Sequence, residues 1–500
     1  MSRTVLMLLE GTYPFVRGGV SSWIHQIIRG MPEFTFDLLF IGGSRKHYGR
    51  MQYELPPNVR ELKCHYLEDA WESRRGHRQE GPRAAFEAAE TLHDSFRSGC
   101  PKDSDLFSLL DLVASEEPAI THEQFLFSRS AWDSIVRSYE ARCTDPSFLN
   151  YFWTVRSMHA PVFLLAEVAR RVRPPKIIHS ISTGYAGLLA AMLKGQNPDC
   201  AFILSEHGIY TKERKIDLSQ ADWIKEPSAD FEPGLTDDVG YIRQMWIRFY
   251  QQLGRITYEA ADPIISLYGG NQARQIADGA RPERTRVIPN GIPLAPYAGA
   301  LDARPAEIPK VVGFIGRVVP IKDVKTFLRA MRTICSVIPE MEGWIVGPTE
   351  EDEDYAAECR GLVASLGLSE RVKFLGFQKV SEILPQIGVL TLTSISEAQP
   401  LVILEGYAAG VPCVATDVGS CREMIEGAPG EDAALGVSGS VVGISDPVAT
   451  ADACLELFQN PQKWAACQRA ALARVERFYT EALMFERYRG LYRDALVERG

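Results

Sequence analysis

Short apolar runs alternate with amphipathic stretches along most of the chain. The run TVLMLLEG at 4–11 predicts a strand, and the next segment has apolar residues at helical spacing, namely Val20, Trp23, Ile24, Ile27 and Ile28. Four more strand-like runs follow in the first half, at 35–43, 176–182, 201–208 and 263–268. From residue 310 the alternation begins again with KVVGFIGR, a helix from about 322, and GWIVGP, VKFLGF, VLTLTSIS, CVATDV and GSVVGI. The pattern predicts an α/β protein with two doubly wound units and parallel sheets.

Three segments depart from this alternation. Residues 64–150 are charged and helical in character without strand-like runs, which predicts a helical insertion in the first unit. Residues 292–310 are rich in Pro and Ala, which favours a linker between the units. The segment 460–500 predicts long helices. Because 500 residues exceed what a single core supports, at least two domains are expected.

The amino-acid composition limits the kinds of function to be considered. The chain has 46% hydrophobic and 24% charged residues, as an ordinary globular protein does. Its net charge of −10 gives no support to a nucleic-acid role. The ten cysteines show no CxxC and no metal-like spacing, which favours reduced packing residues and a cytoplasmic protein. We expect no signal peptide, because the first apolar run ends after five residues, and no run approaches the roughly 18 apolar residues of a membrane span.

The stretch SEAQPLVILEGYAAGVPCVAT at 396–416 holds the first candidate site. Pro400 and the later Gly-Val-Pro predict a helix from about 400 to 409, directly after a strand. Glu397 then lies in the loop before the helix and Glu405 lies within it, so both can face a ligand at the helix N-terminus. A strand, a loop and a helix in this order place ligands at the carboxyl edge of a parallel sheet. The alternative is that each Glu is buried and satisfied by its neighbours.

Other loops after strands carry further candidates. Arg317 and Lys322 follow the strand ending at Gly316 and suit a diphosphate, although a pair of surface cations is the alternative. A glycine pair before the first helix, a strand-end histidine and a tight turn complete this set: Gly18, Gly19, His207, Asn290 and Gly291. The acidic run 350–354 contains a spacing seen in metal-using transferases, and we interpret it as a solvated N-terminal helix turn.

Together these motifs resemble a known family. GRVVPIKD, VIPNGI, VKFLGF and the spacing Glu397-x7-Glu405 resemble the nucleotide-sugar domain of retaining GT-B glycosyltransferases of the family 4 type. EGTYPFVRGGVSSW, HSISTGYAG and SEHGIYTKERKIDL resemble the cytosolic glycosyltransferases of bacterial Pel exopolysaccharide systems. The resemblance implies two Rossmann-like domains facing a cleft, at 1–291 and 292–478, with a C-terminal helix at 479–500 that packs back on the first.

The same resemblance implies roles for the candidates. Glu405 would bind the donor ribose, and Glu397 the hydroxyls of the donor sugar. Arg317 and Lys322 would stabilise the leaving UDP, so that no metal and no cofactor are expected. The remaining implied positions are substrate-binding, with His207 beside the donor sugar: Gly18, Gly19, Asn290, Gly291, Gln399, Pro400, Leu401 and Val402. Retention would follow from front-side attack rather than from a covalent intermediate on Glu397.

The expected function is therefore transfer from a UDP-sugar donor to a growing bacterial exopolysaccharide, in the cytoplasm or at the inner membrane beside polysaccharide export proteins. Two alternatives remain: a UDP-sugar epimerase of the same architecture, and a non-catalytic UDP-sugar-binding protein. Incubation with UDP-sugar separates the epimerase from the transferase, because an epimerase isomerises the donor, whereas a transferase releases UDP faster when an acceptor is added. A binding protein would turn over nothing. An NAD-dependent dehydrogenase is disfavoured, because no strand is followed by GxGxxG.

Overall fold

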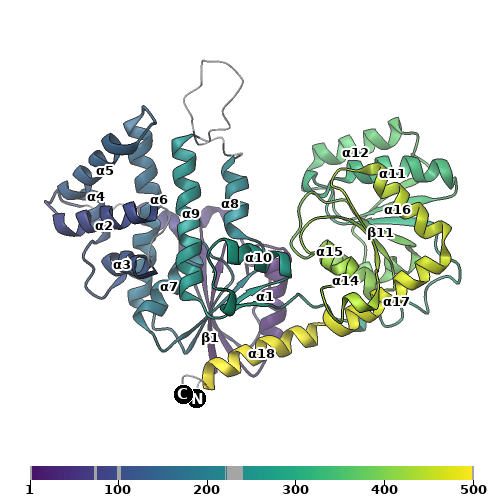
Figure 1. Cartoon of the computed structure of the whole chain (residues 1–500), viewed down its shortest axis with the longest axis horizontal. Helices are drawn as coiled ribbons and strands as arrows, with labels where there is room; N and C mark the ends of the chain where they lie inside the picture. The colour runs from purple at the N-terminus through teal and green to yellow at the C-terminus, as the bar shows by residue number, and fades with distance from the viewer. Residues whose placement is uncertain are drawn as a thin grey trace. The chain divides into compact units, whose positions relative to one another are not determined.

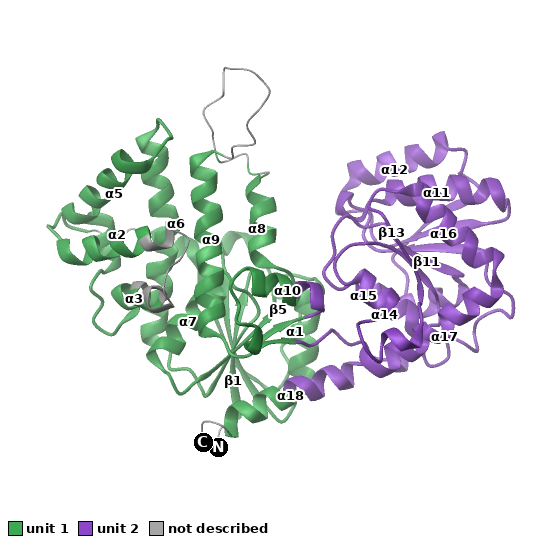
Figure 2. Ribbon diagram, viewed as in Figure 1, with its two compact units in different colours: residues 1–266, 272–286, 489–500 green, residues 267–271, 287–488 purple. Residues whose placement is uncertain are grey.

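The computed structural model describes residues 3–71, 76–97, 103–219, 221, 224 and 240–497. The chain divides into two compact units (Figures 1 and 2). Unit 1 comprises Met1–Ser266, Gln272–Arg286 and Arg489–Gly500, and unit 2 comprises Leu267–Asn271 and Val287–Tyr488. Each unit contains its own sheet, which confirms the predicted pair of α/β domains. That the two domains face each other across a cleft stays a prediction.

The sheet of unit 1 has the strand order β3-β2-β1-β4-β5-β6-β7. Strands β1 to β6 pair in parallel. Their bounds are β1 Thr4–Glu10, β2 Thr35–Gly42, β3 Val59–Tyr66, β4 Ile177–Ser180, β5 Ala201–Glu206, β6 Ile264–Ser266 and β7 Thr285–Val287. The chain continues from β1 to β2 on one side, whereas β4 pairs with the other side of β1. The strand order therefore reverses between β1 and β4, a position that often holds ligands in such sheets.

The helices of unit 1 include the predicted insertion. They are α1 Gly19–Gly30, α2 Arg83–Arg97, α3 Asp103–Ala114, α4 His122–Phe127, α5 Arg129–Arg142, α6 Phe148–Arg171, α7 Tyr185–Gln196, α8 Tyr210–Ser219, α9 Tyr241–Ala260 and α10 Gly269–Ala277. The predicted bounds 64–150 are wrong at both ends. Cys64 and Tyr66 belong to β3, which pairs with β2, and α6 continues to Arg171 because its apolar residues pack into the core.

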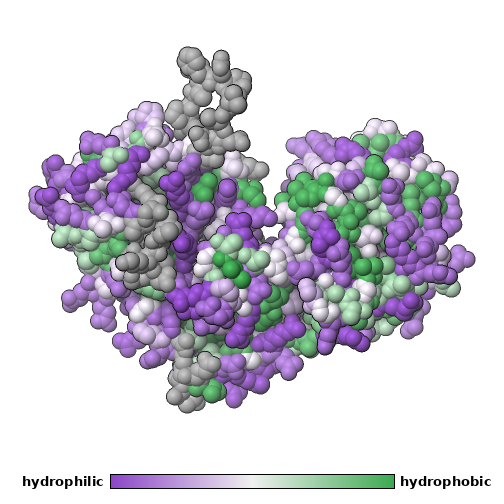
Figure 3. Space-filling view, viewed as in Figure 1, coloured by the Kyte–Doolittle hydropathy of each residue, from purple (hydrophilic) through white to green (hydrophobic). Residues whose placement is uncertain are grey.

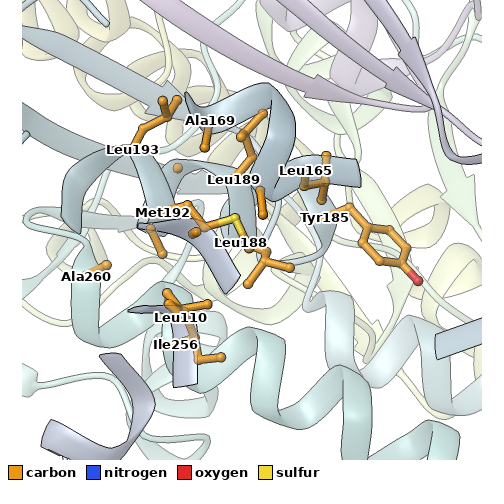
Figure 4. Close-up of a cluster of buried hydrophobic side chains, with 14 of the residues drawn as sticks. Leu110, Leu165, Ala169, Tyr185, Leu188, Leu189, Met192, Leu193, Ile256 and Ala260 are labelled. Atoms are coloured by element: carbon orange, nitrogen blue, oxygen red, sulfur yellow. The ribbon is translucent and has the colours of Figure 1, made fainter. Parts of the chain in front are cut away.

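The insertion shares a core with the rest of unit 1. Leu110 of α3 and Leu165 of α6 lie in the same buried cluster as Leu188 and Met192 of α7 and Ile256 of α9 (Figure 4). All five side chains are at most 5% exposed. The insertion is therefore part of the folded body of unit 1 and stabilises it by apolar burial.

The sheet of unit 2 has the strand order β10-β9-β8-β11-β12-β13, with parallel pairing throughout. The strands are β8 Val311–Ile315, β9 Glu342–Val346, β10 Val372–Gly376, β11 Val389–Leu392, β12 Cys413–Thr416 and β13 Gly439–Val442, which confirms each strand-like run predicted for this unit. The helices are α11 Val324–Val337, α12 Glu353–Ser365, α13 Val380–Ile383, α14 Leu401–Ala408, α15 Cys421–Glu426, α16 Pro447–Gln459, α17 Pro461–Phe478 and α18 Glu481–Val497.

The segment predicted as a linker, 292–310, belongs to unit 2. Ile292 forms a bridge with Thr480, and Tyr297 and Ala300 are buried in the apolar cluster of that unit. The long continuous segment of unit 2 begins at Val287 and not at Ile292. The linker prediction is wrong because small apolar residues in an irregular segment can pack into a core as readily as those in a helix.

The C-terminal helix α18 contributes to both units. Its first residues to Tyr488 belong to unit 2, and the residues from Arg489 onward belong to unit 1. Arg489 pairs with Glu33, and the hydroxyl of Tyr492 lies 2.7 Å from Nδ1 of His179.

Polar residues cover much of the face shown in Figure 3, with apolar patches between them. None of the helices in the described part of the chain combines the length and the apolar character of a membrane span.

Candidate functional site

An ion pair between two loops lies at the carboxyl edge of the unit 2 sheet. Lys322 follows β8 and Glu397 follows β11, and these strands are neighbours. The Nζ of Lys322 lies 2.5 Å from Oε1 of Glu397, and the side chains are 21% and 12% exposed, respectively. The two candidates that the sequence assigned to different parts of a donor thus contact each other.

Hydrogen bonds hold these two loops together. The hydroxyl of Thr393 donates to the carbonyls of Lys322 and Asp323, at 3.1 and 2.9 Å. The backbone N–H of Ile395 donates to the carbonyl of Ile321 at 2.9 Å. Lys322 ends a 3-10 turn, and Asp323 caps α11 with a left-handed backbone (φ 44°), so the helix predicted from about 322 begins at Val324. The backbones of the two loops therefore hold Lys322 and Glu397 close to each other.

Gly419 allows a third loop to approach Glu397. Its φ is +55°, and a Cβ there would lie 2.4 Å from the carbonyl oxygens of Glu397 and Ala398. The N–H of Ser420 donates to the Ala398 carbonyl at 2.8 Å. A larger residue at 419 would displace the Glu397 loop, since both the backbone angle and the space exclude a side chain.

Helix α14 begins directly after this loop. Pro400 is its N-cap with an extended backbone, so the helix covers Leu401–Ala408 and not the predicted 400–409. The N–H groups of Leu401 and Val402 belong to the first turn, whose amides have no acceptor within the helix. The positive end of the helix dipole therefore lies beside the Lys322–Glu397 pair. Gln399 just before it accepts a hydrogen bond from the N–H of Asn290 at 2.7 Å.

Glu405 lies in α14, half-buried, and is hydrogen-bonded to the hydroxyl of Tyr297. Burial raises the pKa of Glu405, and the hydrogen bond from Tyr297 opposes part of that rise. Burial also raises the pKa of Tyr297, with a further contribution from the charge of Glu405. Tyr297 was missed in the sequence because it lies in the segment interpreted as a linker. Its aromatic side chain in an Ala- and Pro-rich stretch was the available signal.

Arg317 forms an ion pair of its own and is not part of the Lys322–Glu397 pair. Its guanidinium pairs with Glu351, and both side chains are about half exposed. The acidic run that contains Glu351 begins α12, with Asp352 as the N-cap accepting from the N–H of Tyr355 at 2.9 Å. This confirms the predicted N-terminal turn. The described residues contain no group of three or more His, Cys, Asp and Glu side chains that could hold a metal ion.

Asn290 and Gly291 pack against other backbone. A Cβ at Gly291 would lie 2.2 Å from the carbonyl oxygen of Thr480, so glycine is required for the approach of this segment to the start of α18. Asn290 Oδ1 and Gln399 Nε2 are buried and have no hydrogen-bond partner among the described residues. Unpaired buried polar atoms of this kind are costly to stability.

Unit 1 holds the remaining candidates. Gly18 is the N-cap of α1 and Gly19 its first residue, and a Cβ at either would have no heavy atom within 4 Å. His207 follows β5, is 6% exposed, and packs edge-on against Trp23 with ring centroids 4.4 Å apart. Burial lowers its pKa to about 4, and its Nε2 has no hydrogen-bond partner among the described residues. His207 is therefore a neutral ring at pH 7.

Two family models match the chain, one in each unit. Residues 3–283 match the family described as Domain of unknown function (DUF3492). The chain belongs to the DUF3492 family. In unit 2, residues 309–460 match the family Glycosyl transferases group 1. This second match contains Arg317, Lys322, Glu397 and Glu405. Of the motifs that resembled a nucleotide-sugar domain, GRVVPIKD, VKFLGF and the two glutamates lie within it, whereas VIPNGI at 287–292 precedes it.

Curated relatives and solved structures extend these matches. A D-inositol 3-phosphate glycosyltransferase of Acidothermus cellulolyticus is 32% identical over 244 residues, which cover 46% of this chain and 52% of the relative. The chain thus spans about half the length of the curated relatives it matches. The structure of Anabaena HepE in complex with UDP aligns over 99% of this chain and 100% of that protein, with a TM-score of 0.60 and 15% identity.

Sucrose-phosphate synthase from Thermosynechococcus elongatus aligns over 99% of both chains, with a TM-score of 0.57 and 17% identity. Their likeness over nearly the whole chain confirms the predicted GT-B fold with two Rossmann-like domains. At such low identity the likeness shows the fold alone. The resemblance to the Pel-system glycosyltransferases stays a prediction.

Proposed function

We propose that the chain is a retaining glycosyltransferase that uses a UDP-sugar donor without a metal ion and extends a bacterial exopolysaccharide of the Pel type. The observation that carries this proposal is the Lys322–Glu397 ion pair beside the first turn of α14. It combines a cation, a carboxylate and free helix amides at one edge of a parallel sheet. That combination suits a diphosphate joined to a sugar.

Donor binding would rearrange the charges of this pair. The diphosphate would attract Lys322 and the positive end of α14, and so draw Nζ away from Glu397. Glu397 would then accept hydrogen bonds from the hydroxyls of the donor sugar. Arg317 would exchange Glu351 for the same diphosphate, and Glu405 would accept from the ribose. The UDP bound to HepE supports the choice of nucleotide.

The charges would also assist bond cleavage. As the bond between sugar and phosphate breaks, negative charge grows on UDP beside Lys322 and Arg317, and positive charge grows on the sugar beside Glu397. The leaving phosphate would accept the proton of the attacking acceptor hydroxyl on the same face, which retains the anomeric configuration. The exopolysaccharide acceptor is supported by the three motifs of unit 1 that resemble the Pel-system enzymes.

A donor panel tests this proposal. UDP release and UDP binding are measured with UDP-glucose, UDP-GlcNAc and UDP-GalNAc, with and without EDTA, and NMR assigns the anomer of the product. We expect turnover of at least one donor in EDTA with retained configuration. Arg317→Ala and Lys322→Ala should each weaken UDP binding by about 1.5–3 kcal/mol. Lys463→Ala is the matched control, because this Lys lies on α17 and pairs with Glu456.

The outcomes separate the alternatives. An isomerised donor without transfer would identify an epimerase, and binding without turnover would identify a UDP-sugar-binding protein. Unchanged UDP affinity in both cation variants would place the diphosphate site elsewhere. Loss of turnover in EDTA that is restored by a divalent cation would contradict metal independence.

A further inference from the structure

A polar cluster in unit 1 lies where the strand order of its sheet reverses. Glu10 ends β1, and Ser182 follows β4, the strand that pairs with β1. Tyr210 and Arg214 belong to α8, which follows the next strand, β5. Loops at such a reversal point form a crevice beyond the carboxyl ends of the strands. The polar cluster is therefore placed where an α/β domain ordinarily binds a ligand.

The carboxylate of Glu10 is fixed by neutral donors. Its Oε2 accepts from the hydroxyl of Ser182 at 3.1 Å and from the N–H of Ala186 at 3.0 Å. Its Oε1 accepts from the hydroxyl of Tyr210 at 2.9 Å. Because a carboxylate offers about four acceptor positions, Oε1 retains room for one more donor. Glu10 is only half-buried, so a donor from a ligand can reach it.

Neighbouring residues hold this arrangement in place. A Cβ at Gly184 would lie 2.7 Å from Oε1 of Glu10 and 2.4 Å from the Tyr210 ring, so glycine permits their contact. Glu206 is 2% exposed and accepts from the N–H of Tyr210 at 3.0 Å. The hydroxyl of Tyr258 and the amide of Gln275 also donate to Glu206, at 2.7 and 3.1 Å. The start of α8, and with it Tyr210, is thereby anchored to the end of β5.

Arg214 supplies hydrogen-bond donors next to Glu10. Its guanidinium lies over the Tyr210 ring, 5.3 Å from the centroid, and one N–H group pairs with Asp217 at 2.8 Å. Its Nε has no acceptor among the described residues. Arg214 and Glu10 both contact Tyr210, since its ring lies under the guanidinium and its hydroxyl donates to the carboxylate. An arginine has five N–H donors, and most of these remain for a ligand.

Two further tyrosines border the same cluster. Tyr185 and Tyr250 are hydrogen-bonded to each other, and the ring centroid of Tyr250 lies 5.8 Å from that of Tyr210. The ring of Tyr185 joins the apolar core, whereas its hydroxyl points away from the other labelled side chains (Figure 4). Aromatic rings that carry hydroxyls beside a carboxylate and a guanidinium provide apolar faces, donors and acceptors together.

We propose that this cluster binds a pair of adjacent hydroxyls on a neutral sugar, the terminal residue of the acceptor glycan. The inference rests on the proposed function, which requires an acceptor. One hydroxyl would donate to Oε1 of Glu10, and its neighbour would accept from Arg214. A phosphorylated sugar is disfavoured, because its charge would be repelled by Glu10. The acceptor class would therefore differ from the sugar phosphate named for the D-inositol 3-phosphate glycosyltransferase of Acidothermus cellulolyticus.

Glycan binding by the full chain tests the proposal. The probes are an array of neutral oligosaccharides ending in glucose, galactose or N-acetylhexosamines, and the same glycans carrying a terminal 6-phosphate, all in the presence of UDP. We expect wild type to bind at least one neutral glycan and to prefer it to its phosphorylated form. Glu10→Gln and Arg214→Met should each weaken that binding at least about tenfold.

A control variant, UDP affinity and thermal unfolding accompany the glycan-binding measurement. Glu283→Gln removes one exposed carboxylate from the same unit and should bind like wild type. UDP affinity should stay unchanged in all three variants, and thermal unfolding reports whether each is folded. Should Glu10→Gln fail to fold, Arg214→Met decides, because this side chain is 39% exposed. Unchanged glycan binding in the folded variants, binding of phosphorylated glycans only, or binding of none would overturn the proposal.

The same experiment separates this inference from the proposed function. If no UDP-sugar is turned over but neutral glycan binding depends on Glu10, the transferase proposal fails and the sugar site stands. If UDP-sugar is turned over but the Glu10 and Arg214 variants bind glycan normally, the transferase proposal stands and the acceptor lies elsewhere.

Discussion

Lys322 and Glu397 are 75 positions apart in the chain and form a 2.5 Å ion pair at the carboxyl edge of the unit 2 sheet. Each side chain is largely withdrawn from solvent, so neither charge is well hydrated without the other. On the proposed function, the ion pair holds two donor-binding groups in a neutralised form. A diphosphate can replace Glu397 as the partner of Lys322 without leaving a cation unpaired.

A double-mutant cycle should measure this coupling. Lys322→Met and Glu397→Gln each leave the other group without its partner, and we expect each to lower the free energy of unfolding by about 1–3 kcal/mol. The double variant should lose less than the sum of the two. Urea denaturation of the full chain, followed by a fluorescence signal from unit 2, gives the values. Strictly additive losses would show that the two charges do not stabilise each other.

The buried histidines of unit 1 should make it sensitive to acid. Burial lowers the pKa of His207 to about 4 and that of His179 to about 3, below the ordinary value of 6.5. The unfolded chain therefore binds protons that the folded unit does not. Stability is complete above pH 6.5 and falls as pH decreases toward 4, by up to about 1.4 kcal/mol per pH unit for each histidine.

Denaturation at pH 7, 6 and 5 checks this expectation. His207→Gln removes one of the two titrating groups, so its loss of stability over this range should be clearly smaller than that of wild type. A variant that loses stability as steeply as wild type would show that His207 does not titrate as its burial indicates.

The sequence pattern predicted strands most reliably where the strand is buried along its whole length. Each strand predicted in unit 2 is present. The inner strands β8, β11 and β12 are buried on both faces, whereas the edge strands β10 and β13 were predicted from short apolar runs of their own, VKFLGF and GSVVGI. Strand β3 was missed because it lies at the sheet edge and is half exposed, so its sequence, VRELKCHY, lacks a continuous apolar run. β7 has three residues, too few for any periodicity.

Candidate residues were easier to predict than their contacts. Glu397, Lys322 and Glu405 were chosen because they follow strands or lie on a helix after one. Their partners come from distant segments, as the contact of Glu405 with Tyr297 illustrates. No local pattern encodes such a contact, since it depends on which loops the sheet order brings together. The Glu10 cluster was missed for the same reason.

Helix α18 should stabilise unit 1 through one buried hydrogen bond. The hydroxyl of Tyr492 lies 2.7 Å from Nδ1 of His179, and both side chains are 0% exposed. Tyr492→Phe removes this bond and should lower the free energy of unfolding of unit 1 by about 1–3 kcal/mol. Deleting residues 480–500 should cost more, because the described part of this segment buries Met484, Tyr488, Leu491, Tyr492 and Ala495. Leu483 and Phe485 of the same helix are only partly buried. Unaltered thermal stability of either variant would contradict this role of the helix.

Donor binding should depend on pH through Glu405. Burial raises its pKa above the ordinary 4.5, so the carboxylate takes up a proton at a higher pH than an exposed Glu does. Protonation removes acceptor capacity for the ribose hydroxyls, and the donor KM should therefore rise as pH falls toward that raised pKa. In Glu405→Gln the KM should be higher at neutral pH and change less with acidification. Equal pH profiles for the two proteins would exclude Glu405 as the titrating group.

Substitutions of Glu397 and Glu405 should affect different kinetic constants. Glu405 would contact only the nucleotide, which is bound alike in the ground and transition states, so Glu405→Gln should raise the donor KM more than it lowers kcat. The Gln side chain can still accept the hydrogen bond of Tyr297, which limits structural disturbance. Glu397 would lie beside the sugar, where positive charge develops, so Glu397→Gln should reduce kcat by about 100-fold or more.

The ion pair adds a second criterion for Glu397. In Glu397→Gln, Lys322 no longer has a carboxylate partner that competes with the diphosphate, so affinity for free UDP should be equal to or higher than in wild type. UDP titration and UDP release measured on both variants distinguish the roles. If Glu397→Gln loses UDP binding while Glu405→Gln keeps it, the nucleotide lies against Glu397 and the assignment of the two residues along α14 is reversed.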